Sequence, residues 1–213
     1  MFRISVLTLL LVGCSNDHRS APQAKPVEAG PSVVSKVIGP EGGVVELPGG
    51  PRLEIPAGSL VAPRTFSITR LGEQYPVGAL SSAYAFSPRD LAFAHPATVS
   101  FPVPDGLHDV DIYWLVNGGT RHDRLGAALA NHRLTGEVIR LGTAYLAPRA
   151  GGRAVWGRGA KPGRIVARRG RTVPCDVRVF ADGTYLVPDV REGDDVVLLE
   201  TVSDVAGAPV PAC

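Results

Sequence analysis

The sequence has few cysteines, few aromatic residues and little net charge. Of 213 residues, three are cysteines and 6% are aromatic, and the formal net charge is +2. Cysteines without a Cys-x-x-Cys spacing or a nearby His do not indicate a zinc or dithiol site. A nearly neutral chain is also not a strong polyanion binder as a whole. The longest hydrophobic run, Ile4 to Val12, is too short to span a bilayer.

Motifs of the common enzyme classes are also missing. The sequence contains no Gly-x-Ser-x-Gly, no His-Glu-x-x-His and no P-loop or dinucleotide glycine pattern. The glycine-rich stretch from Gly39 to Gly50 is not followed by a helix start that would hold a phosphate. We therefore expect no enzymatic activity, no cofactor and no metal site. An enzyme accessory or hydrolytic module is the alternative, recognisable by a His and an acid that converge on a Ser or a metal.

What the sequence does contain favours short strands. It has 25 Gly and 19 Pro distributed along its length, and 45% of its residues are hydrophobic. Frequent turn residues between short apolar runs are typical of all-β proteins. The length allows one or two domains.

The first 14 residues predict export and lipidation. Met1-Phe2-Arg3 is a short positive start, and the apolar segment after it ends in Leu11-Val12-Gly13-Cys14. This pattern indicates a signal peptide over residues 1–13. Leu-Val-Gly-Cys resembles the lipobox of bacterial lipoproteins, and the resemblance implies that Cys14 is acylated, by palmitate among other chains, and becomes the first mature residue. An ordinary secretory signal with an incidental cysteine is the alternative.

Residues 14–32 are predicted to be a tether between the lipid and the folded part. The segment has three prolines and no apolar periodicity, and His18 within it is expected to be solvated. A coil of that length reaches roughly 25 Å. Residue 15, directly after the cysteine, is Ser. In enteric bacteria an Asp at that place favours retention at the inner membrane. The outer membrane is therefore the preferred location.

Strand patterns occupy residues 33–149. The stretch from Ile38 to Leu60 is typical of a hairpin, because Leu53 and Ile55 alternate with charged residues and Gly and Pro separate the two apolar runs. Ile112 to Val116 is a continuous apolar run, as expected of a buried central strand. Further strands are predicted at 33–38, 66–71, 84–86, 99–103, 125–129, 138–141 and 145–146. Short strands at this spacing predict an antiparallel β-sandwich.

Four blocks in this region resemble the ZU-five domain of zonula occludens scaffolds, netrin receptors and ankyrins. They are Ile-Gly-Pro-Glu-Gly-Gly-Val-Val, Leu-Glu-Ile-Pro-Ala-Gly-Ser-Leu, the stretch from Phe86 to Pro104, and Ile-Tyr-Trp-Leu-Val. The resemblance implies a β-sandwich used for protein contacts. Some relatives cleave themselves at His-Phe-Ser, and the matching place here is Leu141-Gly142-Thr143. It keeps a hydroxyl but has no base, so no self-cleavage is expected.

A second, smaller β-sandwich is predicted over residues 150–213. Its five strand patterns are at 154–156, 164–167, 177–180, 184–187 and 196–199, and Asp182-Gly183 indicates a tight hairpin. The order is similar to transthyretin-like or carboxypeptidase-regulatory-like modules. Cys175 and Cys213 are predicted to form a disulfide, which would stabilise so small a unit by about 3 to 4 kcal/mol. A metal or redox site of two thiols is the alternative.

This second unit has an uneven charge distribution. Eight cations between Arg149 and Arg171 have no acid among them, whereas acids dominate from Asp182 to Asp204. The basic face could bind anionic lipid or an acidic partner, and the candidate anion-binding residues are Arg158, Lys161, Arg164, Arg168, Arg169 and Arg171. The other interpretation, which we favour, pairs the basic half with the acidic half across the sheet. Nucleic acid is not an expected partner.

Acidic and histidine residues elsewhere are expected to be structural. Asp105, His108, Asp109 and Asp111 could form a calcium loop, but EF-hand spacing and its closing Glu are absent, which favours a polar turn. His122 and His132 are predicted to be loop residues and not ligands, and His95 is predicted to cap a strand.

Together, these features predict a bacterial envelope lipoprotein that acts as a non-catalytic binding or assembly module. Its expected partners are the bilayer, through acylated Cys14, and an envelope protein or surface polymer. Docking on an anionic surface through residues 149–171 is a further alternative.

Overall fold

The computed structural model describes residues 32–72, 78–89, 91–116, 121–159, 166–168 and 177–197. Within these ranges the fold is all-β and sandwich-like, which confirms the predicted class. No helix among the described residues has the length and apolarity needed to cross a bilayer. Every strand pair in the structure is antiparallel.

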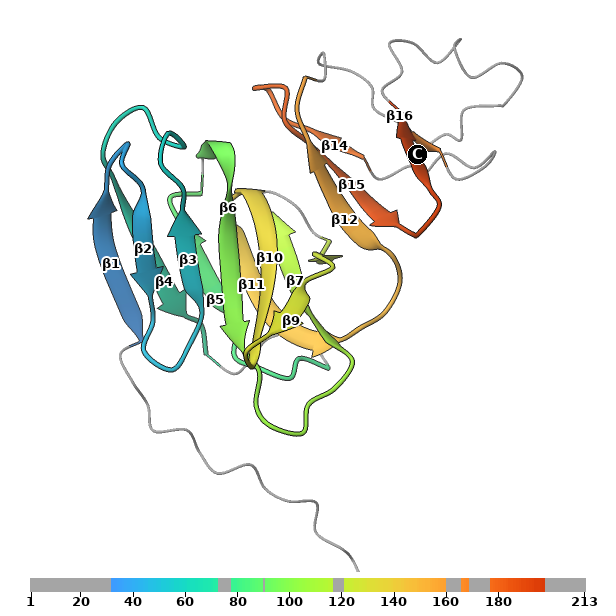
Figure 1. Ribbon diagram of the computed structural model, residues 1–213, viewed down its shortest axis with the longest axis horizontal. Coiled ribbons are helices and arrows are strands. Elements are labelled where there is room, and N and C mark those ends of the chain that lie inside the picture. The colour runs from blue at the N-terminus through green and yellow to red at the C-terminus, as the bar shows by residue number, and fades with distance from the viewer. Residues whose placement is uncertain are drawn as a thin grey trace, which may run out of the picture.

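Two sheets form the larger part of the molecule and lie face to face (Figure 1). The first has the order β1-β4-β5-β11-β7-β8, with β1 (Val33–Ile38), β4 (Arg64–Arg70), β5 (Tyr84–Ser87), β11 (Gly142–Pro148), β7 (Val110–Val116) and β8 (Asp123–Arg124). The second has the order β2-β3-β6-β10-β9, with β2 (Gly43–Glu46), β3 (Arg52–Ile55), β6 (Ala92–Pro102), β10 (Arg133–Arg140) and β9 (Ala128–Ala130).

The predicted hairpin is β2 and β3, and the structure confirms its alternation. Val45 is opposite Leu53 in the register, and both side chains are buried, whereas Glu46 and Glu54 are exposed. The turn before β2 requires Gly42, because its φ is +78° and a Cβ there would lie 2.5 Å from the carbonyl oxygen of Ile55. The hairpin therefore contributes one apolar face to the core between the sheets.

The core contains aromatic side chains from both sheets. Trp114 of β7 and Phe86 of β5 are fully buried, with ring centroids 5.2 Å apart, and Phe101 of β6 packs on Phe86 from the facing sheet. Tyr113 and Leu115 of β7 are only half-buried, because successive side chains of a strand point to opposite faces and theirs is the face away from the core. The expectation of a central strand buried on both faces is thus met on one face.

Two sequence predictions differ from the structure in this region. Residues 125–127 do not form a strand, because Gly126 has a φ of +70° and the chain turns between β8 and β9. His95 does not cap a strand, because it lies within β6, which is 11 residues long and begins before it. The carbonyl of His95 accepts a hydrogen bond from the Ser59 hydroxyl at 3.2 Å.

The described residues from 150 onward form two smaller sheets. One has the order β12-β15-β14, with β12 (Arg153–Gly157), β15 (Tyr185–Val190) and β14 (Arg178–Val179), and the other pairs β13 (Val166–Arg168) with β16 (Asp195–Val197). The Asp182-Gly183 turn joins β14 to β15, as the sequence predicted. Ala154 and Leu186 belong to the same buried cluster as the large sandwich. The apolar core therefore continues into this part of the chain.

Candidate functional site

The polar residues predicted as a loop before β7 are separated by the structure. Asp111 is on β7 itself and is fully buried, whereas Asp105 is exposed beside His132, with 3.4 Å between Oδ1 and Nδ1. Asp109 lies 3.8 Å from the Nε atom of Arg149. Among the described residues, no three His, Cys, Asp or Glu side chains are grouped as metal ligands would be.

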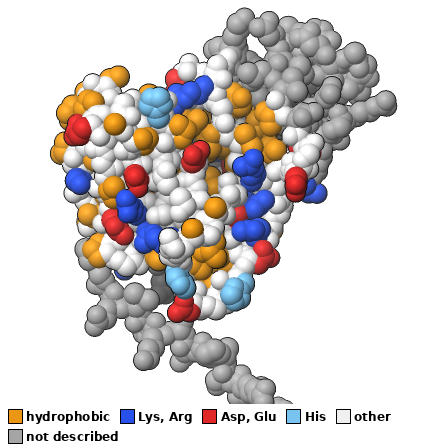
Figure 2. Space-filling view, viewed as in Figure 1, with side chains coloured by type: hydrophobic (Ala, Val, Ile, Leu, Met, Phe, Trp, Pro, Cys, Tyr) orange, Lys and Arg blue, Asp and Glu red, His pale blue; other side chains and the backbone are white. Residues whose placement is uncertain are grey.

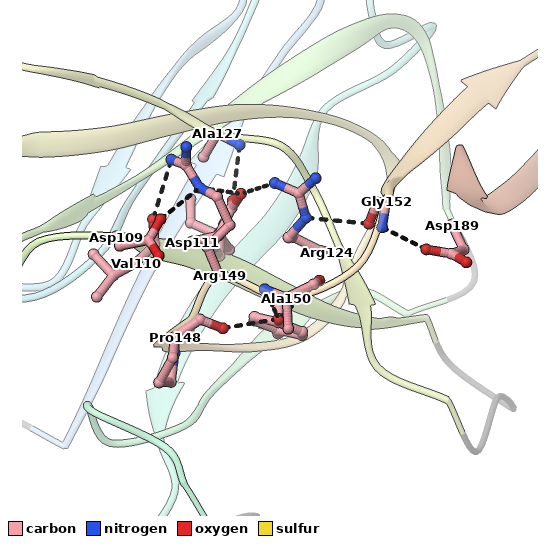
Figure 3. Close-up of polar contacts among 12 residues, drawn as sticks. Asp109, Val110, Asp111, Arg124, Ala127, Pro148, Arg149, Ala150, Gly152 and Asp189 are labelled. Atoms are coloured by element: carbon pink, nitrogen blue, oxygen red, sulfur yellow. Dashed lines mark hydrogen bonds and ion pairs between the residues drawn. The ribbon is translucent and has the colours of Figure 1, made fainter. Parts of the chain in front are cut away.

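Asp111 instead joins strands from different parts of the chain (Figure 3). Its Oδ1 accepts hydrogen bonds from the backbone N–H groups of Ile112 and Ala127, each at 2.8 Å, and its Oδ2 lies 2.8 Å from Nη1 of Arg124. Arg149 approaches the same Oδ2 at 3.7 Å. A buried carboxylate needs this degree of pairing to offset its lost hydration. Asp111 thus has a structural role.

The same arginine connects the large sandwich to the segment that follows it. Arg124 donates from Nε to the carbonyl of Gly152 at 3.1 Å, while its Nη1 binds Asp111. The N–H of Gly152 donates to Asp189 of β15 (Figure 3). A chain of polar contacts therefore runs from β7 through Arg124 to β15.

A second buried carboxylate also links the two parts of the molecule. Asp123 on β8 forms ion pairs with Arg178 of β14 and with Arg121, the latter at 3.2 Å. Next to it, His122 packs edge-on against Tyr145 at a centroid distance of 5.2 Å, and burial lowers the pKa of His122. His122 lies just before β8, as predicted for a loop residue, and the expectation that it is not a ligand stays a prediction.

Arg140 at the end of β10 forms a third link. Its guanidinium lies 4.2 Å from the centroid of the Phe180 ring, donates to the Thr184 hydroxyl at 3.0 Å and pairs with Asp182 at 2.6 Å. Burial alone would raise the pKa of Asp182, but hydrogen bonds from Arg140 and Thr184 outweigh it and lower that pKa to about 2. The Asp182-Gly183 turn is thereby fastened to the large sandwich.

The lowered pKa of Asp182 predicts that the stability of the fold depends on pH. A carboxyl with a depressed folded-state pKa contributes stability above its unfolded value of 3.8 and loses that contribution as the pH falls toward 2. We expect the urea midpoint of the wild type to fall further than that of Asp182→Asn between pH 5 and pH 2. Asp105→Asn serves as control, since Asp105 is almost fully exposed. Equal pH profiles for wild type and Asp182→Asn would contradict the assignment.

A groove lies between β10 and β12, about 340 Å³ in volume. Its apolar lining comes from Leu125, Ala128, Val138, Ile139, Ala154, Val155 and Trp156, together with Pro96 of β6. Two charged side chains of opposite sign, Glu137 and Arg153, also line it. Figure 2 shows hydrophobic side chains on this face, with acidic and basic side chains among them.

Most of the site residues predicted from the sequence do not line this groove, or are not described by the structure. Arg158 is exposed, whereas Cys14, Cys175, Cys213, Lys161, Arg164, Arg169 and Arg171 lie outside the described residues. The backbone register places Arg168 of β13 opposite Asp195 of β16. Pairing of the basic with the acidic half and docking through the basic segment both stay predictions.

Sequence reasoning missed the groove and the network around Asp111. A weak signal for Asp111 was present, because an Asp beginning an apolar strand must find a partner if that strand is buried. Thr143, in the stretch matched to the self-cleavage site, is buried in β11 between β5 and β7. The expectation of no self-cleavage stays a prediction.

No protein-family model matches the chain, and no curated protein matches it significantly. The likeness to ZU-five domains and to bacterial lipoproteins therefore depends on the quoted motifs.

Proposed function

We propose that this chain is a bacterial lipoprotein that displays a β-sandwich for non-catalytic binding or assembly at the cell envelope. The observation that carries the proposal is Leu11-Val12-Gly13-Cys14 after a short basic and apolar start. Acylation of Cys14 with more than one chain would anchor the protein stably, at about 0.8 kcal/mol per buried methylene. The outer membrane is the proposed location.

The use of polar groups inside the fold supports a binding role. Asp111 and Asp123 are the two buried carboxylates among the described residues, and both form ion pairs with arginines that hold strands together. Ser100 is engaged likewise, since its hydroxyl accepts a hydrogen bond from Arg133 at 3.1 Å. These groups stabilise the scaffold, and the surface that they support is available for contacts.

The distance between anchor and fold also fits this role. Eighteen residues separate Cys14 from β1. As a flexible coil they would span roughly 25 Å. That reach is enough to hold the sandwich clear of the lipid headgroups and to present it to a partner.

The proposal is tested by the chemistry of residue 14. In a bacterium that processes lipoproteins, wild-type chain should incorporate radiolabelled palmitate and give a mature N-terminal peptide with an acylated Cys14. Cys14→Ser should lose the label entirely because the thioether cannot form. The matched control is Cys175→Ser, which should keep the label. Unlabelled wild-type protein released into the medium would refute the anchor.

A further inference from the structure

Two turns that the structure describes contain an Asp-Gly step, and the fold restrains them very differently. Asp105-Gly106 lies between β6 and β7, and Asp182-Gly183 lies between β14 and β15. In an Asp-Gly step the backbone nitrogen of the glycine can attack the side-chain carboxyl of the aspartate, because no Cβ hinders the approach and the backbone is free to rotate. In a folded protein the rate of this attack depends on how firmly the two reacting groups are held.

Asp105-Gly106 leaves both reacting groups free. The Asp105 side chain is 95% exposed, and its one ion pair among the described residues is with the His132 ring, which is 83% exposed, at 3.4 Å. A pair between two such exposed side chains is weak and does not hold the carboxyl in place. The N–H of Gly106 donates to no described group, since the hydrogen bond of this turn runs from the N–H of Leu107 to the carbonyl of Pro104.

The backbone at this turn also has room to move. Gly106 is exposed and has a φ of +84°, and no atom lies within 4 Å of the place where its Cβ would be. The turn is part of the loop between the end of β6 at Pro102 and the start of β7 at Val110. Rotation of the Asp105 carboxyl toward the glycine nitrogen therefore disturbs no packed group.

Asp182-Gly183 holds both reacting groups instead. The N–H of Gly183 donates to the carbonyl of Phe180 at 2.9 Å. Oδ1 of Asp182 accepts from the backbone N–H and the hydroxyl of Thr184, at 3.1 and 2.6 Å, and Oδ2 pairs with Arg140 at 2.6 Å. The pKa of Asp182, lowered to about 2, keeps this carboxyl ionised, and a carboxylate is a poorer electrophile than a carboxylic acid. Several bonds must break before this step can react.

We propose that Asp105 is a site of spontaneous backbone modification, at which aspartate isomerises to isoaspartate. The Gly106 nitrogen forms a bond to Cγ of Asp105 and gives up its proton, and one carboxyl oxygen leaves as water. Solvent water then opens the five-membered succinimide ring. Addition at Cγ restores aspartate, whereas addition at the α-carbonyl breaks that carbon's bond to the nitrogen, so that the main chain runs through Cγ. One water leaves and one returns, and nothing is oxidised or reduced. The inference does not rest on the proposed binding function.

The experiment follows both Asp-Gly steps in one sample of full-length mature protein, kept in detergent near neutral pH for several weeks. Isoaspartate carries a free α-carboxylate, which protein L-isoaspartate methyltransferase labels from radioactive S-adenosylmethionine, and peptide mapping locates the label. We expect isoaspartate to form at least about tenfold faster at position 105 than at position 182, because the bonds around Asp182-Gly183 add to the barrier there. Asn117-Gly118, outside the described residues, can also form isoaspartate, and its position in the map distinguishes it.

Two variants test the assignment and the protection. Asp105→Glu should lose the label at position 105, because a six-membered ring closes much more slowly, and should leave the rate at position 182 unchanged. Arg140→Met removes the ion pair and should speed isomerisation at position 182 by about threefold or more. It should not change the rate at position 105, where the reacting groups are already free.

A measurement on the unfolded wild type needs no variant to fold. In guanidinium chloride the contacts that protect Asp182-Gly183 are lost, so the two rates should come within about threefold of each other. Convergence would show that the fold, and not the neighbouring sequence, sets the difference. Equal rates in the native protein, a faster rate at position 182, or a tenfold ratio that persists in guanidinium chloride would each overturn the proposal.

Discussion

Asp111→Ala is expected to lower the free energy of unfolding by about 3 to 5 kcal/mol, as for one partner of a buried ion pair. The substitution leaves the guanidinium of Arg124 largely buried without its carboxylate, and it leaves the N–H groups of Ile112 and Ala127 without their acceptor. Urea unfolding followed by circular dichroism measures the effect.

A control variant and a double variant show whether this loss comes from the buried ion pair. Asp105→Ala removes an exposed carboxylate from the loop before β7 and should cost less than about 0.5 kcal/mol. Asp111→Ala combined with Arg124→Met should recover part of the loss, because no charge is then left unpaired. A cost below about 1 kcal/mol for Asp111→Ala alone would show that the buried network does not hold β7, β8 and the Ala127 segment together.

Leu186→Ala is expected to destabilise the whole described fold by about 2 to 5 kcal/mol, the range for a leucine truncated in a packed core. Leu186 is on β15, outside the two large sheets, yet it is 1% exposed and packs in the main core cluster. A single unfolding transition should shift, and fluorescence and circular dichroism should report the same midpoint. Both parts of the chain carry a reporter, since Trp114 is on β7 and Trp156 on β12.

The alternative outcome would be equally informative. If residues from 150 onward folded as a separate module, Leu186→Ala would lower only one of two transitions, and the two signals would diverge. Val61→Ala is the control, because the Val61 side chain is fully exposed and its loss should change stability by less than about 0.5 kcal/mol.

Local patterns predicted the strands well. The hairpin of β2 and β3 follows from period-2 alternation between turn residues, and Asp182-Gly183 marks the turn between β14 and β15. Such features depend on residues near in sequence, which is why they can be recognised without a structure. The predicted strand at 125–129 was wrong in its first part, because the acceptor for the Ala127 N–H is Asp111, 16 residues earlier in the chain.

The candidate site was much less predictable. In the sequence, Glu137 and Arg153 look like ordinary charged residues at outward positions of strands. The residues next to them in sequence do not indicate that both line one groove. The basic segment is recognisable from the sequence because no acid interrupts its cations. Of its described members, Arg149 is near Asp109 and Asp111, and the backbone of Arg168 is opposite Asp195.

By itself, the sequence determined the all-β class, the places of most strands and the lipobox-like motif at Cys14, since turn residues, alternation and a targeting motif are all local. Only the tertiary structure decided that Asp111 is buried among arginines and that Leu186 belongs to the main core. These features arise from contacts between segments far apart along the chain. Burial and pairing depend on which strands become neighbours, and hydrophobic patterning within one strand does not specify its neighbour.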